Sequence, residues 1–259
     1  VDDIDMQMTH VIRGDDHVNN TPRQINIFRA LGTSLPYFAH VPMILGSDGE
    51  RLSKRHGAVS VMQYEEEGYL PAALNNYLAR LGWSHGDAEM FSLPQFVQWF
   101  DLEHISRSAA QFNPEKLLWL NQQYLKAADS TLLGEALARR LPEHGVNGSF
   151  NAGKLAAVAE LIKPRVSTLA ELADAAVYFF RPIHASAELL GQHLTDTAQS
   201  ALADLAQRLG QIEWRKEDIG RVIKELLAAR KLKMPELAMP LRVAVCGTPQ
   251  TPSIDATLE

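Results

Sequence analysis

The chain has 259 residues, a net charge of −6 and a hydrophobic fraction of 46%, the composition of an ordinary folded protein. Its length exceeds the usual size of one domain, about 100–150 residues, so we expect two or three domains. No apolar run approaches the roughly 20 residues that cross a bilayer, and the first residues do not resemble a signal peptide, so we expect a cytoplasmic protein. The single cysteine, Cys246, excludes an internal disulfide framework, and we expect it to be buried as a small apolar residue.

The first 50 residues predict alternating strand and helix. We expect a strand at 9–12 leading into the polar turn 13–17, and a helix at 21–31 with Thr21 as its N-cap and Gly32 at its end. A second strand is expected at 37–45, followed by the turn 46–49. Strand, helix, strand is the doubly wound pattern, in which ligands bind beyond the carboxyl ends of the strands. The loops 13–17 and 46–55 are therefore expected to form one ligand-binding edge.

Beyond residue 60 the pattern becomes helical. The apolar spacing predicts helices at 61–67, 72–81, 93–100, 114–125, 132–140, 152–162, 169–179, 197–209 and 214–229. One short strand is expected at 241–245. No glycine-rich phosphate loop precedes the first strand, so we expect that the first half of a doubly wound fold is missing and that both ends are truncated.

Positive charge is concentrated in one part of this acidic chain. Residues 208–242 carry nine lysines and arginines against five acids. The stretch fits a phosphate-facing surface. It also fits a solvated helix face with ion pairs one turn apart, such as Arg221 with Glu217, and composition alone favours this second interpretation.

The densest group of reactive side chains lies at 49–57, Gly-Glu-Arg-Leu-Ser-Lys-Arg-His-Gly. Three cations, a histidine and a hydroxyl between glycines suit a polyphosphate. Cations that meet the leaving pyrophosphate mainly in the transition state would accelerate the attack of a carboxylate on the α-phosphate of ATP. From the pattern alone, an exposed basic turn explains the segment equally well.

This segment resembles the second signature of class I aminoacyl-tRNA synthetases, Lys-Met-Ser-Lys-Ser in consensus and Lys-Leu-Ser-Lys-Arg in the glutamyl branch. Four further segments resemble the same branch in the same order: HVIRGDDH at 10–17, NTPRQ at 20–24, NNYLARLGW at 75–83 and KLLWLN at 116–121. The chain is therefore identified as a member of the bacterial-type glutamyl-tRNA synthetases, as their C-terminal two-thirds without the His-Ile-Gly-His half.

The resemblance implies an α/β fold followed by an all-α part. Residues 1–58 would be the second half of a doubly wound Rossmann-type catalytic domain with its signature loop. Residues 59–126 would be a helical stem-contact region, and residues 127–259 a helical anticodon-binding domain with a truncated C-terminus.

The resemblance also implies a function for a full-length parent: ATP-dependent activation of L-glutamate and its transfer to glutamate tRNA. ATP and Mg²⁺ are the expected cofactors, with the ion held mainly by ATP, and a monomer that does not bind membranes is expected. This chain alone is expected to be inactive. The alternatives are a non-catalytic tRNA-binding fragment, a glutaminyl-tRNA synthetase relative, and a nucleotidyltransferase of the same superfold. The glutaminyl branch carries β-barrels for the anticodon, which the helical series from 132 to 229 disfavours, and a nucleotidyltransferase would leave the helical part unexplained.

The site residues implied by the resemblance fall into three groups, and Lys54 is the expected catalytic residue. ATP would be bound by Asp16, Ile44, Arg51, Leu52, Ser53, Lys54 and Arg55. Glutamate would be bound by Arg13, Gly14, Asp15, Asp16 and His17. The anticodon would be contacted by Arg165, Arg242, Thr251 and Ile254, with Arg165 at the third base. One departure is visible, because Arg51 replaces the first lysine of the signature and presents a planar fork in place of a point charge.

Each of these assignments has a simpler alternative in the residues themselves. Arg13 and Asp16 could form a local ion pair that stabilises the turn. The arginines at 165 and 242 could cap helix C-termini or pair with acids. His10 and His17 could bind a metal with Asp15 or Asp16, but we favour a site without a metal ligand cluster. Whether glutamine tRNA is also charged, and whether the parent binds zinc, stays open.

Overall fold

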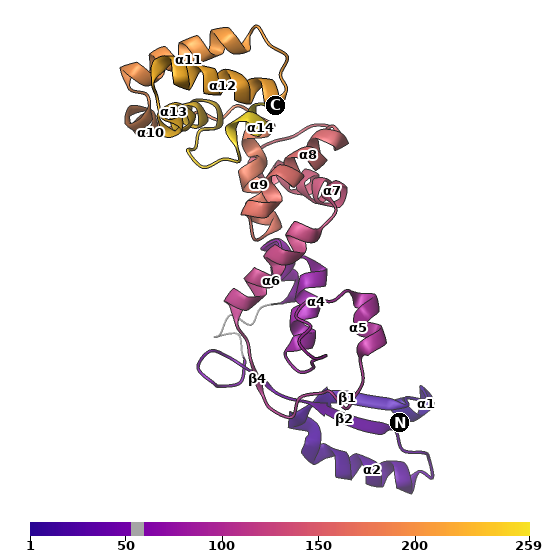
Figure 1. The fold of residues 1–259 in the computed structure, drawn as a ribbon. Helices are drawn as coiled ribbons and strands as arrows, with labels where there is room; N and C mark the ends of the chain where they lie inside the picture. The colour runs from indigo at the N-terminus through magenta and orange to yellow at the C-terminus, as the bar shows by residue number, and fades with distance from the viewer. Residues whose placement is uncertain (53–59) are drawn as a thin grey trace. The chain divides into compact units, whose positions relative to one another are not determined.

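The computed structural model describes residues 1–52 and 60–259, and the chain divides into two compact units, residues 1–124 and 125–259 (Figure 1). The division falls two residues before the expected boundary at 126/127. The other expected boundary, at 58/59, lies outside the described residues. No helix among the described residues is long and apolar enough to cross a membrane.

The first unit begins with a two-stranded parallel sheet. Strand β1 (His10–Gly14) pairs with β2 (Tyr37–Val41), in a register that runs from His10 opposite Tyr37 to Gly14 opposite Val41. The short helix α1 (Asp2–Asp5) precedes β1, and the 3-10 helix η1 (Asp15–Asn20) and helix α2 (Thr21–Ala30) connect the two strands. Gly32 adopts a left-handed φ of 68° after α2, which explains why glycine ends this helix. The predicted strand–helix–strand order is confirmed.

Two local predictions in this region are wrong. The strand expected at 37–45 is interrupted at Pro42, which has no N–H to donate to a ladder, so that β2 and β3 (Ile44–Leu45) are separate. β3 pairs in parallel with β4 (Ala110–Gln111), which the sequence pattern did not predict. Thr21 is not the N-cap of α2, because Asn20 occupies that position and the Thr21 hydroxyl contacts Arg13 instead.

The remaining helices of the first unit follow the predicted segments closely. They are α3 (Val61–Glu66), α4 (Pro71–Arg80), α5 (Leu93–Trp99) and α6 (Pro114–Ala127), which runs across the division between the units. The side chains of Ser60 and Ser92 cap α3 and α5, because each accepts a hydrogen bond from a backbone N–H in the first turn of its helix. Helices α4 and α6 share a core of Leu74, Tyr77, Leu81, Leu117 and Leu120.

The second unit is helical and contains no strand among its residues, all of which are described, so the predicted all-α second part is confirmed. Its helices are α7 (Ser130–Arg140), α8 (Ala152–Ile162), α9 (Leu169–Ala176), α10 (Ala187–His193), α11 (Asp196–Leu209), α12 (Lys216–Arg230), α13 (Met234–Cys246) and α14 (Ile254–Leu258), joined in part by the 3-10 turns η3 (Leu141–His144), η4 (Lys163–Arg165) and η5 (Val177–Phe179).

Two close packings hold this unit. A Cβ on Gly134 would lie 2.9 Å from the backbone N of Ala156, so glycine allows α7 and α8 to approach closely. Helices α11, α12, α13 and α14 enclose a core that includes the fully buried Ile219, Leu226 and Leu237. Figure 1 shows α11, α12 and α13 gathered together near the C-terminus.

The strand predicted at 241–245 is wrong, because these residues belong to α13. In Leu-Arg-Val-Ala-Val, large apolar residues stand at every second position, as in a strand with one buried face. The burial does not keep this alternation, since Val245 is 47% exposed. Buried residues of α13 recur at helical spacing, since Leu241 lies four positions after Leu237 and Cys246 lies three positions after Val243. Cys246 is 1% exposed, as expected, and burial raises the pKa of its thiol to about 11.

Candidate functional site

Arg13, near the end of β1, is held by neighbouring elements. Its Nη2 donates to Thr21 Oγ1 at 2.9 Å, its Nε approaches His40 Nε2 at 3.5 Å, and its guanidinium carbon lies 5.5 Å from the centre of the Phe38 ring. These contacts come from α2 and β2. The alternative of a local ion pair with Asp16 is therefore not what the structure shows.

Asp16 instead pairs with a residue 35 positions away. Arg51 Nη2 lies 3.3 Å from Asp16 Oδ2, and both side chains remain accessible to solvent. A Cβ on Gly14 would lie 2.6 Å from Asp16 Oδ1, so glycine leaves room for this carboxylate. Asp15 and His17 are exposed on the same turn, where His17 Nδ1 lies 3.3 Å from Asn20 Nδ2.

Residues 44–52 form a tight hairpin that brings Ile44, Arg51 and Leu52 together. Leu45 and Arg51 form an antiparallel bridge, and Leu52 N donates to the Ile44 carbonyl at 2.9 Å. Gly49 has a φ of 80°, which a residue with a side chain adopts only with strain. The turns after β1 and β3 therefore meet through the Asp16–Arg51 pair. Ser53, Lys54 and Arg55 lie outside the described residues.

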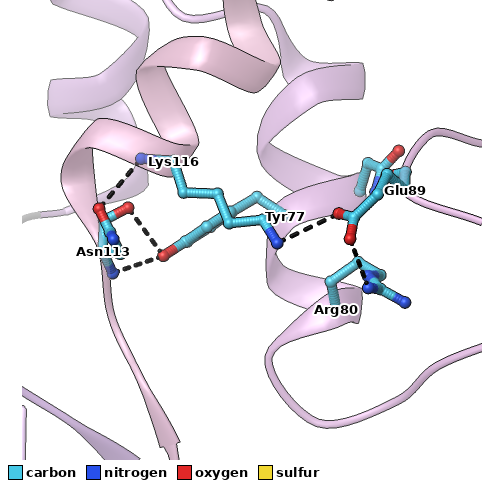
Figure 2. A network of polar contacts seen from close by, with 6 residues as sticks. Tyr77, Arg80, Glu89, Asn113 and Lys116 are labelled. Atoms are coloured by element: carbon cyan, nitrogen blue, oxygen red, sulfur yellow. Dashed lines mark hydrogen bonds and ion pairs between the residues drawn. The ribbon is translucent and has the colours of Figure 1, made fainter. Parts of the chain in front are cut away.

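A polar network joins α4 to the start of α6 (Figure 2). The Tyr77 hydroxyl accepts from Asn113 N at 2.6 Å and donates to the Asn113 carbonyl at 3.0 Å. Glu89 pairs with Lys116 at 3.1 Å and with Arg80 at 3.0 Å. The hydrogen bond from Lys116, aided by the charge of Arg80, lowers the pKa of the Glu89 carboxyl.

These residues line a cavity of about 180 Å³. Ligand pockets for drug-sized molecules have volumes of roughly 300–1,000 Å³, so this cavity is too small for a nucleotide. The network links α4 and Glu89 to Asn113, two residues after the end of β4, and to Lys116 at the start of α6. A larger cavity of about 800 Å³ lies in the second unit, among α8, α13 and α14, and none of the predicted site residues line it.

The four residues expected at the anticodon come together in the second unit, although they lie far apart in the sequence. Arg165 Nη1, from η4, donates to the Thr251 carbonyl. Arg242, from α13, donates through Nε to Thr251 Oγ1 at 3.0 Å and through Nη2 to the Pro252 carbonyl at 3.3 Å. The side chains of Thr251 and Ile254 are buried, the latter in the α11–α14 core. Both arginines thus hold the 251–252 segment, in place of the helix-capping or acid-pairing roles that the residues alone allowed.

The basic stretch at 208–242 is partly neutralised by ion pairs. Asp204 pairs with Arg208 at 2.7 Å and with Arg230 at 3.1 Å. Arg221 pairs with Asp218 at 2.7 Å and, at 3.7 Å, with Glu225. A solvated helix face with ion pairs explains at least this part of the stretch.

Sequence reasoning missed two residues of the first site. His40 approaches the Arg13 guanidinium, and Gln111 contacts the hairpin through its side chain. No sequence signal marked Gln111, because the strand that contains it, β4, is two residues long and has no periodicity. Among the described residues, no group of three or more His, Cys, Asp or Glu side chains is arranged to hold a metal ion.

Comparison with known proteins agrees with the order of the two parts of the chain. Residues 1–119 match the family model "tRNA synthetases class I (E and Q), catalytic domain", and residues 121–259 match "Anticodon binding domain". The glutamate–tRNA ligases of Thiobacillus denitrificans and Janthinobacterium are 63% and 62% identical to the chain over its full length. The chain covers 55% and 56% of these two proteins, a smaller share than the two-thirds expected.

Solved structures show the same relationship. The glutamate tRNA ligase from Elizabethkingia meningosepticum, solved in complex with its amino acid, superimposes with a TM-score of 0.84 at 28% identity, over 98% of this chain and 54% of that one. The glutamate-tRNA synthetase from Elizabethkingia anophelis gives a TM-score of 0.80 at 29% identity, with the same coverage. The chain therefore belongs to the glutamyl-tRNA synthetase family of class I, and it spans about half the length of the relatives that it matches.

Proposed function

We propose that the complete protein activates L-glutamate with ATP and transfers the glutamyl group to the terminal adenosine of glutamate tRNA. The observation that carries this proposal is the Asp16–Arg51 contact, which joins the turn after β1 to the hairpin that leads into the signature. These two turns contain the residues that we assign to glutamate and to ATP. The proposed domains are those of the sequence analysis, with residues 1–58 catalytic, 59–126 contacting the tRNA stem and 127–259 binding the anticodon.

Arg13 is the proposed partner of a glutamate carboxylate, with Gly14, Asp15, Asp16 and His17 around it. Among the described residues, the hydrogen bonds of Arg13 use Nε and Nη2, so Nη1 is left for a ligand. A guanidinium that is already held in place loses less side-chain entropy when it binds a carboxylate. Arg13 is therefore suited to fix the orientation of the amino acid.

Arg51 is a proposed phosphate ligand, together with the signature residues Ser53, Lys54 and Arg55. Its side chain is 66% exposed, and an exposed ion pair such as Asp16–Arg51 contributes only about 0–1 kcal/mol. A polyphosphate can therefore replace Asp16 as the partner of Arg51 at little cost. Asp16, the backbone of Ile44 and Leu52 would then border the rest of the nucleotide, and Mg²⁺ would be held mainly by phosphates and water.

The proposed reaction begins when a glutamate carboxylate oxygen attacks the α-phosphorus of ATP and pyrophosphate leaves. Negative charge builds on the phosphoryl oxygens, so cations placed around them lower the barrier if they interact most strongly in the transition state. Lys54 is the residue we assign to this role. The protein would act in the cytoplasm as a monomer.

The second unit is the proposed tRNA-binding part, with Arg165 and Arg242 at the anticodon. Single-stranded RNA bases are recognised through their edges and faces, and guanidinium groups suit both kinds of contact. The bonds of both arginines to the 251–252 segment support this assignment, because they hold the two guanidinium groups near one another. A non-catalytic tRNA-binding role for this chain alone is compatible with the same geometry.

Pyrophosphate exchange by the full-length protein tests the proposed function. We expect exchange that requires both L-glutamate and glutamate tRNA, and we expect glutamine not to replace glutamate. The chain of residues 1–259, assayed in parallel, should give no glutamyl-adenylate above background. Exchange with glutamine but not glutamate would favour the glutaminyl branch, and adenylate formation by the 259-residue chain would show that the active site has been misplaced.

A further inference from the structure

We propose that Gln111 is a positioning residue that holds the 46–49 turn and thereby places Arg51 at Asp16. The inference rests on the proposed function, because the turn matters for catalysis only if Arg51 meets ATP. Gln111 is remote from the hairpin in sequence, and no motif of the sequence analysis includes it.

The side-chain amide of Gln111 makes two hydrogen bonds to the turn. Its Nε2 donates to the Gly46 carbonyl at 3.1 Å and to the Ser47 carbonyl at 2.9 Å. An NH₂ group has two hydrogens, so one amide can satisfy both acceptors. These bonds fix the orientation of two successive peptide groups at the start of the turn.

The backbone of Gln111 is fixed against the same hairpin. β4 places Gln111 opposite Leu45 in the parallel register, and Phe112 N donates to the Leu45 carbonyl at 2.8 Å. The amide therefore reaches the turn from a strand that is already paired with β3. Because Leu45 also bridges Arg51, a shift of the turn relative to β3 would move Arg51.

The polar network of Figure 2 fixes the polypeptide just after β4. Asn113, two residues after Gln111, is bonded through both its N–H and its carbonyl to the hydroxyl of Tyr77, which is 3% exposed. Asn113 Oδ1 also accepts from Lys116 N at the start of α6. Helices α4 and α6 thus hold Asn113, β4 pairs with β3, and the side chain of Gln111 makes the final contact, with the turn of the hairpin.

Two substitutions of Gln111 change its hydrogen-bond donors while they keep the length of the side chain. Gln111→Met keeps the length and removes both N–H donors. Gln111→Glu also keeps the length but places a carboxylate against two carbonyl oxygens. Gln98→Glu on the exposed face of α5 is the matched control, since it adds the same charge away from the hairpin.

The first measurement is amide hydrogen exchange in the full-length protein. The N–H groups of Gly46, Gly49 and Leu52 are bonded within the hairpin, and local opening sets their exchange rates. We expect about tenfold faster exchange for these amides in Gln111→Met and a larger increase in Gln111→Glu. Peptides from α4 and α6 and the Gln98→Glu control should match the wild type. Unchanged hairpin exchange in both variants would overturn the proposal.

The second measurement is pyrophosphate exchange, expressed per active site. Misplacement of a ligand by about 1 Å can cost up to roughly a hundredfold in rate, so we expect kcat to fall about tenfold in Gln111→Met and further in Gln111→Glu, with the KM for tRNA within about twofold. The proposed effect of Gln111 on catalysis would be overturned if the variants had the same kcat per active site as the wild type. It would also be overturned if a smaller folded fraction explained the whole loss of activity. If the wild-type protein showed no pyrophosphate exchange while the hairpin amides of the variants exchanged hydrogen faster, the proposed function would be refuted. The role of Gln111 in holding the turn would still stand.

Discussion

Residues 1–50 and the second unit bury their apolar side chains to different extents. In residues 1–50, Phe28 is the one large apolar side chain that is buried, whereas Ile12, Ile27 and Tyr37 are 46%, 55% and 71% exposed. In residues 125–259, Leu226 and its neighbours form a continuous core. Parallel sheets are normally covered on both faces, and a two-stranded sheet alone is marginally stable.

This difference separates the two kinds of predicted site. The residues assigned to ATP and glutamate lie on turns of the region with the smaller core, and they are held by polar contacts such as Arg13–Thr21 and Asp16–Arg51. The arginines assigned to the anticodon lie on η4 and on α13, which is one of the helices around the α11–α14 core. We therefore expect that the first site depends on polypeptide or ligands that cover its exposed apolar surface, and that the second site is formed by its own unit.

The largest expected effect is the contrast between a substitution at a buried apolar residue of the second unit and one at an exposed apolar residue of the first. Leu226→Ala should lower the free energy of unfolding of the second unit by about 2–5 kcal/mol, because it leaves a cavity in a fully buried position. Ile27→Ala should change stability by about 0.5 kcal/mol or less, since its side chain is already solvated. Urea unfolding monitored by circular dichroism gives both values. Equal effects would show that residues 1–50 do not differ from the second unit in packing.

A buried amide in the first unit gives the next contrast. Asn76 is 2% exposed and bonds to the Glu89 carbonyl, Phe91 N and the Tyr124 hydroxyl, whereas Asn75 is exposed. Asn76→Ala should cost about 1–3 kcal/mol, because it leaves buried partners unsatisfied. Asn75→Ala is the matched control and should be close to neutral. If Asn76→Ala left the free energy of unfolding unchanged, the hydrogen bonds of Asn76 would not stabilise residues 60–124.

Most of the longer helices could be predicted, because their apolar residues recur at helical spacing in the sequence, but α13 was predicted in part as a strand and α1, α10 and α14 were not predicted. The order of the domains and the two site-bearing turns followed from motifs. The pairing of β3 with β4 could not be predicted, because two residues have no period and each partner is 66 positions away. Gln111 was missed for the same reason, since its role arises from that pairing.

The second unit shows a different limit. Arg165, Arg242 and Thr251 were named together only by resemblance, and their hydrogen bonds depend on how η4, α13 and the 251–252 segment pack. The strand expected at 241–245 shows that local alternation gives way to the packing of a helix with Pro240 inside it.

The smallest effect concerns pH in the first unit. The hydrogen bond from Lys116 lowers the pKa of Glu89 below its ordinary value of 4.5, so the ion pairs contribute stability above that pH and lose it as the pH falls through the lowered value. Glu89→Gln should reduce Tm slightly at pH 7, by the equivalent of about 1 kcal/mol or less, and this effect should fade as the pH drops below 4.5 and through the lowered pKa. Thermal melts across this range measure the difference. A Tm difference that persists at the acid end would assign the effect to packing.

The central claim is that the first unit serves activation and the second reads the anticodon. The measurement that tests it most directly is aminoacylation by the full-length protein of glutamate tRNA and of a variant with an altered third anticodon base. We expect Lys54→Ala to lower kcat equally on both tRNAs, by about 10²–10³-fold, with little change in KM for glutamate. Arg165→Gln should leave activation unchanged and reduce the discrimination between the tRNAs by about 1–3 kcal/mol. If Arg165→Gln instead weakened both tRNAs equally and reduced the salt dependence of binding, Arg165 would be a phosphate contact and the account would be contradicted.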